Sequence, residues 1–176
     1  MTITADTVRV FFALWPEHAG RHALACWPSQ LPCKGREMRA ATLHATLVFL
    51  GDVAVDRLEA LQLAAEEVSA RAFELCFDQA RYWGHNHIVY AAPGNIPNEL
   101  SHLVSELEQN LIRHRFAFDS REYKPHVTLL RNARWTDEPL PQMKPVCWKV
   151  EDFVLLQSGR GEVNYTVLAR FPLSNL

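Results

Sequence analysis

A four-residue pattern, histidine followed at the second and third positions by threonine and leucine, occurs once in each half of this chain. The copies are His44 to Leu47 (HATL) and His126 to Leu129 (HVTL). With only 8 histidines among 176 residues, coincidence is a weak explanation for two such copies. The repeat therefore predicts a fold that places two equivalent histidines, one able to accept a proton while the other donates one.

Both copies lie in runs rich in apolar and β-branched residues, which indicates a strand in each case. Side chains alternate between the two faces of a strand, so His44 shares a face with Thr46, and His126 shares one with Thr128. The leucine of each copy then points the other way, into a core. On the polar face, a threonine hydroxyl can donate to a phosphate oxygen while the neighbouring imidazole transfers a proton.

The rest of the chain divides into three helical patterns and several further strands. Apolar spacing predicts helices over 17–27, 56–71 (with Asp56 as its cap) and 97–115, and strands over 8–15, 73–83, 87–92, 146–157 and 164–173. The strands at 73–83 and 87–92 form a hairpin, and 158–161 is a turn. Strands that follow one another in runs favour an α+β fold with antiparallel sheets. Each half contributes one motif strand, so the histidines face each other across a cleft.

Composition limits the class of protein. A chain of 176 residues with 48% hydrophobic residues is expected to form one domain, residues 1–176, with a substantial core. The net charge of −2 gives no sign of a broad basic face, so a nucleic-acid substrate would be held locally, for instance at a terminus.

The cysteine spacing and the lengths of the apolar runs indicate the cellular compartment of the protein. The four cysteines show no paired spacing, which fits a reduced cytoplasm better than a secreted scaffold, and we give them no catalytic role. No apolar run is long enough for a membrane span, and the first residues do not resemble a signal peptide. We expect a soluble, cytoplasmic protein.

The candidate catalytic residues are His44 and His126. Imidazole titrates near pH ~6.5, so a pair can share one proton at neutral pH, as a general acid and a general base require. The alternative is that each histidine is an ordinary surface or core residue, but the matched pair favours catalysis. Thr46 and Thr128 are candidate donors to phosphate oxygens, although threonine is also common in strands for other reasons.

Arg131 and Phe11 are two further candidates for substrate binding. Arginine suits bidentate phosphate binding, but in an ideal strand Arg131 points away from His126, and only a strand end or a bulge returns it to that face. Phe11 could stack on a base, although an aromatic residue in its position is most often core. The remaining paired histidines, His18 with His22 and His85 with His87, lack a zinc-like set of partners, and we predict no metal site.

Three segments resemble the two-histidine phosphoesterase superfamily, and within it the RNA 2′,3′-cyclic phosphodiesterase group, also called 2′-5′ RNA ligases. They are RVFFAL at 9–14, LHATLVFLG at 43–51 and KPHVTLLR at 124–131. Ser158, Tyr165 and FPL at 171–173 also resemble the tail of that family. The paired motifs with their flanks are highly specific, whereas the two ends are weaker.

The resemblance implies a bilobal α+β fold, with two antiparallel sheets and outer helices related by a pseudo-twofold, and an active-site cleft between them. It also implies opening of an RNA terminal 2′,3′-cyclic phosphate to a 2′-phosphomonoester without metal or cofactor. His126 would be the proton acceptor and His44 the proton donor, while Thr46, Thr128 and Arg131 hold the phosphate. The expected partner is RNA with such an end or a small nucleotide, bound by a monomer that needs no membrane and no obligatory protein partner.

Other functions stay open at this point. The same two groups could act on a different cyclic nucleotide or a 2′-5′ oligonucleotide, or catalyse the reverse ligation of RNA ends. A module that binds RNA ends or nucleotides without turnover is the non-enzymatic alternative, but such a module has no need of two proton-transfer groups.

Overall fold

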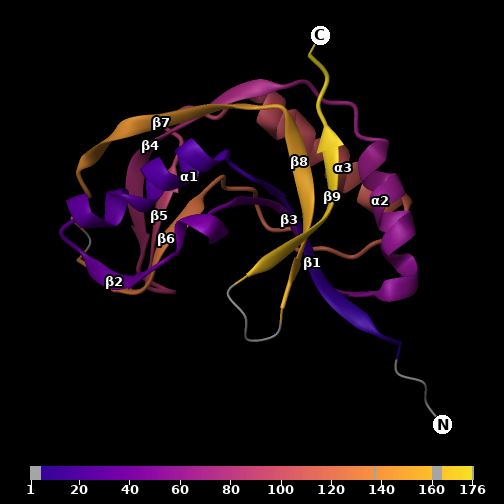
Figure 1. Cartoon of the computed structure of the whole chain (residues 1–176), viewed down its shortest axis with the longest axis horizontal. Helices are drawn as coiled ribbons and strands as arrows, with labels where there is room; N and C mark the ends of the chain where they lie inside the picture. Colours follow the sequence, from indigo (N-terminus) through magenta and orange to yellow (C-terminus); the bar gives the residue numbers. More distant parts are fainter. Residues whose placement is uncertain (1–4, 137, 160–163, 176) are drawn as a thin grey trace.

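The computed structural model describes residues 5–136, 138–159 and 164–175, and two antiparallel sheets form its frame (Figure 1). The first sheet has the order β3-β1-β8-β9, with β1 (Thr7–Leu14), β3 (Ala45–Ala54), β8 (Asp152–Ser158) and β9 (Tyr165–Pro172). The second has the order β2-β6-β5-β4-β7, with β2 (Lys34–Glu37), β4 (Phe73–Trp83), β5 (Ile88–Ala92), β6 (Val127–Arg134) and β7 (Gln142–Val150). The predicted α+β class with two antiparallel sheets is confirmed.

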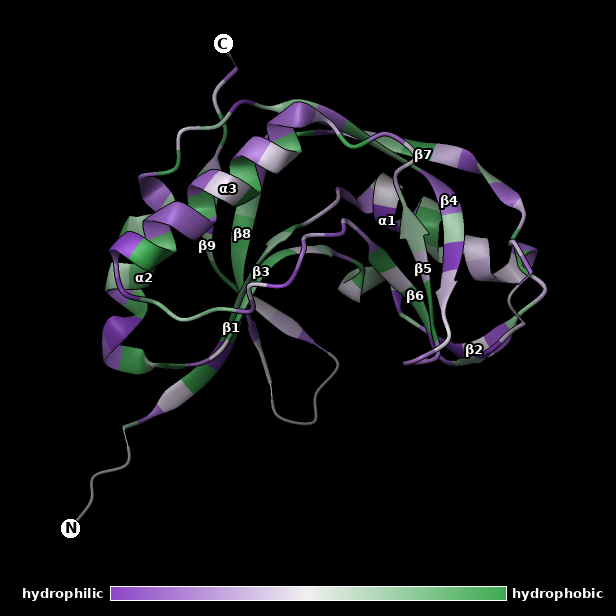
Figure 2. Ribbon diagram, turned by 180° about the vertical axis from the view of Figure 1, so that it is seen from behind, coloured by the Kyte–Doolittle hydropathy of each residue, from purple (hydrophilic) through white to green (hydrophobic). Residues whose placement is uncertain are grey.

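Helices cover one side of each sheet. They are α1 (His18–Ala25), α2 (Leu58–Glu66) and α3 (Asn98–Arg113), with short 3₁₀ turns η1 (Trp27–Gln30), η2 (Ala40–Thr42) and η3 (Val55–Arg57). Contacts join α2 to α3 and both of them to the first sheet, whereas α1 packs against β7 of the second. Polar and apolar residues alternate around α3, and β8 is apolar along most of its length (Figure 2). None of the helices that the structure describes is long and apolar enough to cross a membrane.

The hydrophobic core lies between the helices and the sheets. The leucines of both motifs are part of it, since Leu47 is 4% exposed and Leu129 is 1% exposed. On the opposite face of the first sheet, Phe11 forms a small separate apolar cluster that includes Leu156. The predicted inward direction of the motif leucines is therefore correct, and the other face of each motif strand is left for the cleft.

Each motif strand contains one extra residue directly after its threonine. Two successive residues of β1 pair with the residues on either side of Leu47. In the second sheet, two successive residues of β5 pair in the same way on either side of Leu129. An extra residue of this kind is a β-bulge, and it reverses which face the following side chains occupy. Phe49 and Arg131, each five positions after a motif histidine, therefore return to the face of the histidine and threonine.

The helix predicted over 56–71 is wrong at both ends. The chain leaves β3 through η3, the N-cap of α2 is Arg57 and no side chain caps it, so Asp56 is not the capping residue. After Glu66 the chain turns, and Ser174 then pairs with the segment beyond, receiving a hydrogen bond from the amide of Ala72 and donating one to Ala70. This tertiary pairing overrides the helical pattern. The helix predicted over 97–115 is close to α3, and the hairpin at 73–83 and 87–92 matches β4 and β5.

The strand predicted over 146–157 is two strands in two different sheets. β7 ends at Val150 in the second sheet, and β8 begins at Asp152 in the first. Apolar periodicity indicates a strand but does not say which sheet it joins. As a result the lobes are not the two halves of the chain. The first sheet takes β1 and β3 from its beginning and β8 and β9 from its end, while the second takes β2 and β4 to β7. Of the turn predicted over 158–161, residues 160 and 161 lie outside the described residues.

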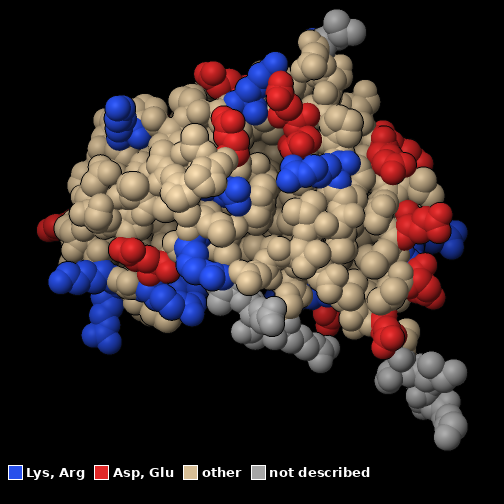
Figure 3. Space-filling view, in the orientation of Figure 1, with Lys and Arg blue, Asp and Glu red and all other residues tan. Residues whose placement is uncertain are grey.

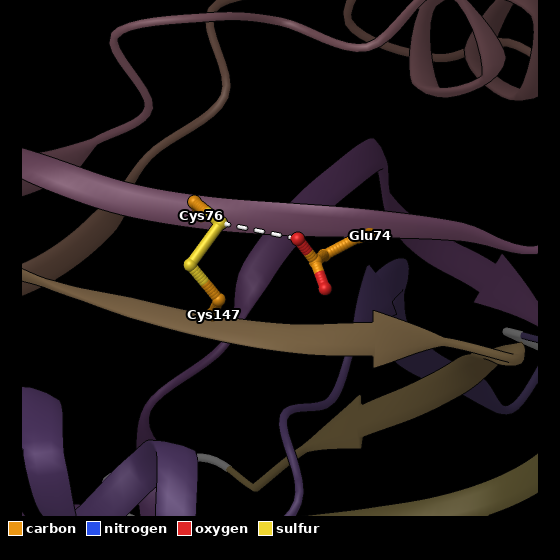
Figure 4. Close-up of side chains that lie close together, drawn as sticks. All are labelled: Glu74, Cys76 and Cys147. Atoms are coloured by element: carbon orange, nitrogen blue, oxygen red, sulfur yellow. Dashed lines mark hydrogen bonds between the residues drawn. A yellow bond between two sulfur atoms is a disulfide. The ribbon is translucent and has the colours of Figure 1, made fainter.

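Two of the four cysteines form a disulfide, contrary to the expectation of reduced thiols. Cys76 of β4 and Cys147 of β7 are directly opposite each other in the sheet, and their sulfurs are bonded (Figure 4). They are separated by 71 positions, a spacing that carries no signal in the sequence. The pairing follows from strand register, which only the fold reveals. Cys26 and Cys33 are free.

Candidate active site

The two motif histidines lie immediately before their strands and are held in the same way. Nδ1 of His44 donates to the carbonyl oxygen of Thr42 at 2.8 Å, and Nδ1 of His126 donates to that of Lys124, also at 2.8 Å. A carbonyl oxygen can only accept, so Nδ1 carries the proton of the neutral ring and Nε2 carries its lone pair. Each histidine is therefore fixed in the tautomer in which Nε2 can take up a proton.

Both histidines line one cleft between the sheets, with a volume of about 270 Å³. All six residues that the sequence nominated line this cleft: Phe11, His44, Thr46, His126, Thr128 and Arg131. Thr46 and Thr128 are half-buried, one from each sheet. The arrangement places two imidazoles, two hydroxyls and a guanidinium around a single small volume, which suits a tetrahedral anion.

Arg131 reaches the cleft because of the bulge at Leu129. Without the extra residue it would share the face of Val127, which is fully buried in the core. With it, Arg131 lines the cleft beside His126 and acts electrostatically on both catalytic candidates. Of the two geometries that the sequence left open for Arg131, the structure has the one that faces the site.

Several residues of the cleft were not nominated from the sequence. Arg9, Met38, Thr42, Phe49, Ser158 and Tyr165 complete its lining. The Arg9 guanidinium lies over the Phe49 ring at 4.9 Å, and Ser158 Oγ is buried with no hydrogen-bond partner among the described residues. One signal could have identified Phe49: it stands five positions after His44, as Arg131 stands five positions after His126.

Aromatic rings surround both histidines. The His44 ring lies 5.0 Å from Phe11 and 5.0 Å from Tyr165, centroid to centroid, and the His126 ring lies 4.8 Å from Trp83. Further out, the Trp15 ring is stacked on His44 at 6.4 Å, and Tyr90 lies 5.7 Å from His126. These rings fix the imidazole planes and exclude water from their surroundings.

The aromatic setting lowers the pKa of both histidines. Burial lowers the pKa of His44 to about 4, and the charges of His126 and Arg131 add to this, while the hydrogen bond to the Thr42 carbonyl opposes it. The pKa of His126 is lowered for the same first reason, with Arg131 adding and the Lys124 carbonyl opposing. Both rings are therefore neutral in the free protein at pH 7, which differs from the singly protonated pair expected from unperturbed imidazole.

The other paired histidines lie away from the cleft. His18 and His22 are exposed on α1 with their rings 4.1 Å apart, and His85 and His87 are exposed in the β4–β5 turn. Within the described ranges, the converging groups of three potential metal ligands comprise one set, namely Glu74, Cys76 and Cys147. The two sulfurs of that set are bonded to each other (Figure 4).

Comparison with known proteins identifies the class. The family model of the 2′-5′ RNA ligase superfamily matches residues 21–162, and this chain belongs to that superfamily. It is 31% identical over 174 residues to the RNA 2′,3′-cyclic phosphodiesterase of Escherichia coli strain K12, a match that covers 97% of this chain and 99% of that protein. The resemblance found in the sequence is thereby confirmed.

Solved structures agree with this relationship. The crystal structure of E. coli LigT complexed with 3′-AMP superimposes with a TM-score of 0.86 at 30% identity, covering 97% of this chain and all of that one (100%). A crystal structure of a phosphoesterase gives 0.87 at 29% identity with the same coverage. TT0787 of Thermus thermophilus, at 22% identity and a TM-score of 0.75, covers 95% of this chain and 98% of its own and shares the fold.

Proposed function

We propose that this protein is an enzyme that hydrolyses the terminal 2′,3′-cyclic phosphate of RNA to a 2′-phosphomonoester. The observation that carries the proposal is the matched anchoring of His44 and His126, which line one cleft and whose Nε2 atoms have no hydrogen-bond partner among the described residues. The activity of the E. coli relative, 31% identical over nearly the full length, supports the choice of substrate.

The reaction needs one proton acceptor and one proton donor on opposite sides of phosphorus, because the attacking and leaving oxygens are roughly in line. We assign His126 as the acceptor that takes a proton from the attacking water, and His44 as the donor that protonates the leaving 3′-oxygen. The bond from phosphorus to the water oxygen forms as the bond to the 3′-oxygen breaks. The 2′-oxygen keeps the phosphate, and neither a metal ion nor a cofactor takes part in these steps.

The nonbridging phosphate oxygens need donors as charge develops on them. Thr46 and Thr128 supply hydroxyls from the two sheets, and Arg131 supplies a guanidinium that can contact two oxygens at once. The base of the terminal nucleotide then has Phe11, Phe49 and Tyr165 on its side of the cleft. Phe11 is only 5% exposed, so the half-buried rings of Phe49 and Tyr165 offer more of the stacking surface.

Substrate binding would also favour the state of the pair in which one histidine, His44, carries a second ring proton. A bound phosphodiester brings a negative charge into the cleft, and an opposite charge nearby favours the protonated imidazole. The pKa of His44 therefore rises from about 4 when substrate binds, which makes this ring an effective acid only in the complex.

One chain supplies every group of this site, since His44 precedes β3 and His126 precedes β6. The first sheet also combines strands from both ends of the sequence, which supports treating residues 1–176 as one two-lobed domain. We accordingly propose that the enzyme acts as a monomer without an obligatory protein partner.

The test is incubation of the purified protein with an RNA oligonucleotide that ends in a 2′,3′-cyclic phosphate, in the presence of a chelator. We expect turnover to a phosphomonoester at an undiminished rate, and no turnover by the His44→Ala variant. Tight binding of this RNA without any product would instead support a non-catalytic RNA-end or nucleotide-binding module. Parallel assays with a mononucleoside cyclic phosphate and a 2′-5′ oligonucleotide would rank the alternative substrates.

A further inference from the structure

Four basic residues lie opposite one another in two pairs on the neighbouring strands β2 and β6. Lys34 lies opposite Arg134, and Arg36 lies opposite Arg131. All four are exposed; we call them the cationic strip. Like charges directly opposite each other in an antiparallel pair are destabilising. Two such pairs in succession therefore cost the sheet stability unless an anion lies between them.

The close approach of the two strands is built into the sequence at Gly35. A Cβ atom at this position would lie 2.8 Å from the carbonyl oxygen of Arg131 and 2.9 Å from Cα of Ala133. Both distances are shorter than real contacts allow, so only glycine lets β2 pack against β6 here. Lys34 and Arg36, on either side of Gly35, are thereby held next to the basic residues of β6, on the neighbouring strand of the same sheet.

Within the part of the chain that the structure describes, no strip residue forms an ion pair, and the acidic residue of β2, Glu37, is paired with Leu130 of β6. The ion pairs formed there involve Arg113, His114, Arg121, Lys149 and Arg170, and none includes a strip residue. Basic side chains gather around the lower edge of the lobe that contains β2 and β6, whereas acidic ones gather on the flank with α2 (Figure 3). The net charge of −2 thus conceals a local cationic surface.

The position of β2 at the edge of its sheet offers a simpler explanation, because charged residues on edge strands prevent pairing between molecules. That role needs charges on β2 alone. It does not account for Arg131 and Arg134, which lie on β6, the next strand inward, at the positions paired with the charges of β2.

The strip leads directly into the cleft through Arg131. This residue lines the cleft together with His126 and Thr128 and also faces Arg36 on the sheet. The pair of Lys34 and Arg134 lies further along the two strands, away from the histidines. A polyanion whose end occupies the cleft would therefore meet a second and a third cation as it leaves.

We propose that the cationic strip binds the phosphodiester backbone of the RNA that leads to the cyclic end. The enzyme then prefers an oligonucleotide to a mononucleoside cyclic phosphate. This inference rests on the proposed function, since it extends the substrate of the same site from a terminal nucleotide to a chain.

The experiment compares an RNA oligonucleotide of about ten nucleotides with a mononucleoside 2′,3′-cyclic phosphate, as substrates of the wild type and of a Lys34→Gln, Arg36→Gln, Arg134→Gln variant. Arg131 is left in place because it belongs to the site. We expect kcat/KM for the oligonucleotide to fall at least about tenfold in the variant at low salt. Its salt dependence should weaken by about two in the log–log slope, at about 0.7 per lost phosphate contact for single strands.

Turnover of the mononucleotide should be unchanged in the strip variant, which also shows that the variant folds. A matched control, Arg71→Gln, Arg115→Gln, Lys144→Gln, removes three exposed cations elsewhere that, like the strip residues, form no ion pair within the described part of the chain, and should leave the turnover of both substrates unaffected. The melting temperature of the strip variant should not fall, because the variant relieves repulsion between like charges.

Equal loss for both substrates, or equal loss in the control, would contradict the strip. Binding of the same oligonucleotide, measured by fluorescence anisotropy, distinguishes failure of the strip proposal from failure of the proposed function. If neither substrate is turned over, about tenfold weaker binding by the strip variant alone still supports the strip, and equal binding by all three proteins overturns it.

Discussion

The two motif strands are built alike up to the fifth position after each histidine and differ there. In both, the histidine precedes the strand, Nδ1 donates to a carbonyl two residues back, the threonine faces the cleft, and a bulge follows. At the position that the bulge returns to the cleft, β3 has Phe49 and β6 has Arg131. The first sheet thus offers a ring where the second offers a guanidinium.

This difference divides the work between the lobes. On the proposed mechanism, the histidine and the threonine are duplicated because hydrolysis needs an acid and a base with donors to the phosphate between them. The residue five positions after each histidine is not duplicated, because a nucleotide end is itself asymmetric. A base needs an apolar flat surface, and a phosphate needs positive charge. We therefore expect Phe49 and Arg131, at matching positions of the two motif strands, to set the direction in which the RNA end lies.

The largest effect should come from removing either histidine. His44→Ala and His126→Ala are each expected to lower kcat by about 10²- to 10⁴-fold, the usual contribution of a proton-transfer group. Because the two act together in one step, the double variant should lose little more than either single one. Near wild-type turnover in either single variant would disprove the acid–base pair.

Arg131→Ala should come next, with a loss of about 10²-fold in kcat, because a donor to the developing phosphate charge is removed. Arg131→Lys should recover only part of it, since an ammonium lacks the bidentate geometry. Steady-state kinetics on a mononucleoside cyclic phosphate measures both. An effect on KM alone would contradict this role, because it would mean that Arg131 binds the substrate and the transition state equally well.

Thr46→Val and Thr128→Val should each lower kcat/KM by about tenfold, as expected for a hydrogen bond to a charged group. The two effects should be similar, because the threonines occupy equivalent positions in the two motif strands, two residues after the histidine and directly before the bulge. If one of the two variants kept the wild-type kcat/KM, the two motifs would be equivalent in their histidines but not in their threonines. Circular dichroism of both variants serves as the control for folding.

Phe49→Ala should raise KM by about five- to tenfold with little change in kcat, because stacking binds the base in the ground state and the transition state alike. The Phe49→Ala variant should thus change mainly KM, and the Arg131→Ala variant mainly kcat. This contrast is what the difference between the two motif strands predicts for the kinetics. A Phe49→Ala variant that lost kcat instead would contradict a base-binding role.

The smallest effect is expected from a change of pH. The pH profile of kcat/KM reports the pKa values of the free enzyme, and that of kcat reports those of the complex. The active form has one histidine protonated and one neutral, so kcat/KM peaks between the two free-enzyme pKa values. Burial holds both below 6.5, with that of His44 at about 4. kcat/KM should therefore fall as pH rises through neutrality, whereas kcat, measured with phosphate bound, should peak at higher pH. A kcat/KM that rises from about pH 6.5 to 8 would contradict this.

The sequence predicted the site better than it predicted the elements around it. The His-x-Thr-Leu repeat alone indicated both faces of both strands, because alternation is a local property of the chain. The direction of Arg131 needed the bulge, and the end of α2 and the division between β7 and β8 needed tertiary pairing. Likewise, the bond between Cys76 and Cys147 depends on the register of β4 against β7, which no local pattern encodes.

Phe49 shows how much a comparison of the two repeats can add, since it occupies the position that Arg131 has in the other copy. A phenylalanine in an apolar strand is usually core, and only the bulge at Leu47 turns this one to the cleft.

The roles of the two histidines are tested most directly by the identity of the monoester formed from an RNA end bearing a 2′,3′-cyclic phosphate, measured by phosphorus NMR in the presence of a chelator. We expect the 2′-phosphate as the sole product, because His44 protonates the 3′-oxygen as it leaves. A 3′-phosphate product would reverse the leaving group and contradict the assigned roles of the two histidines.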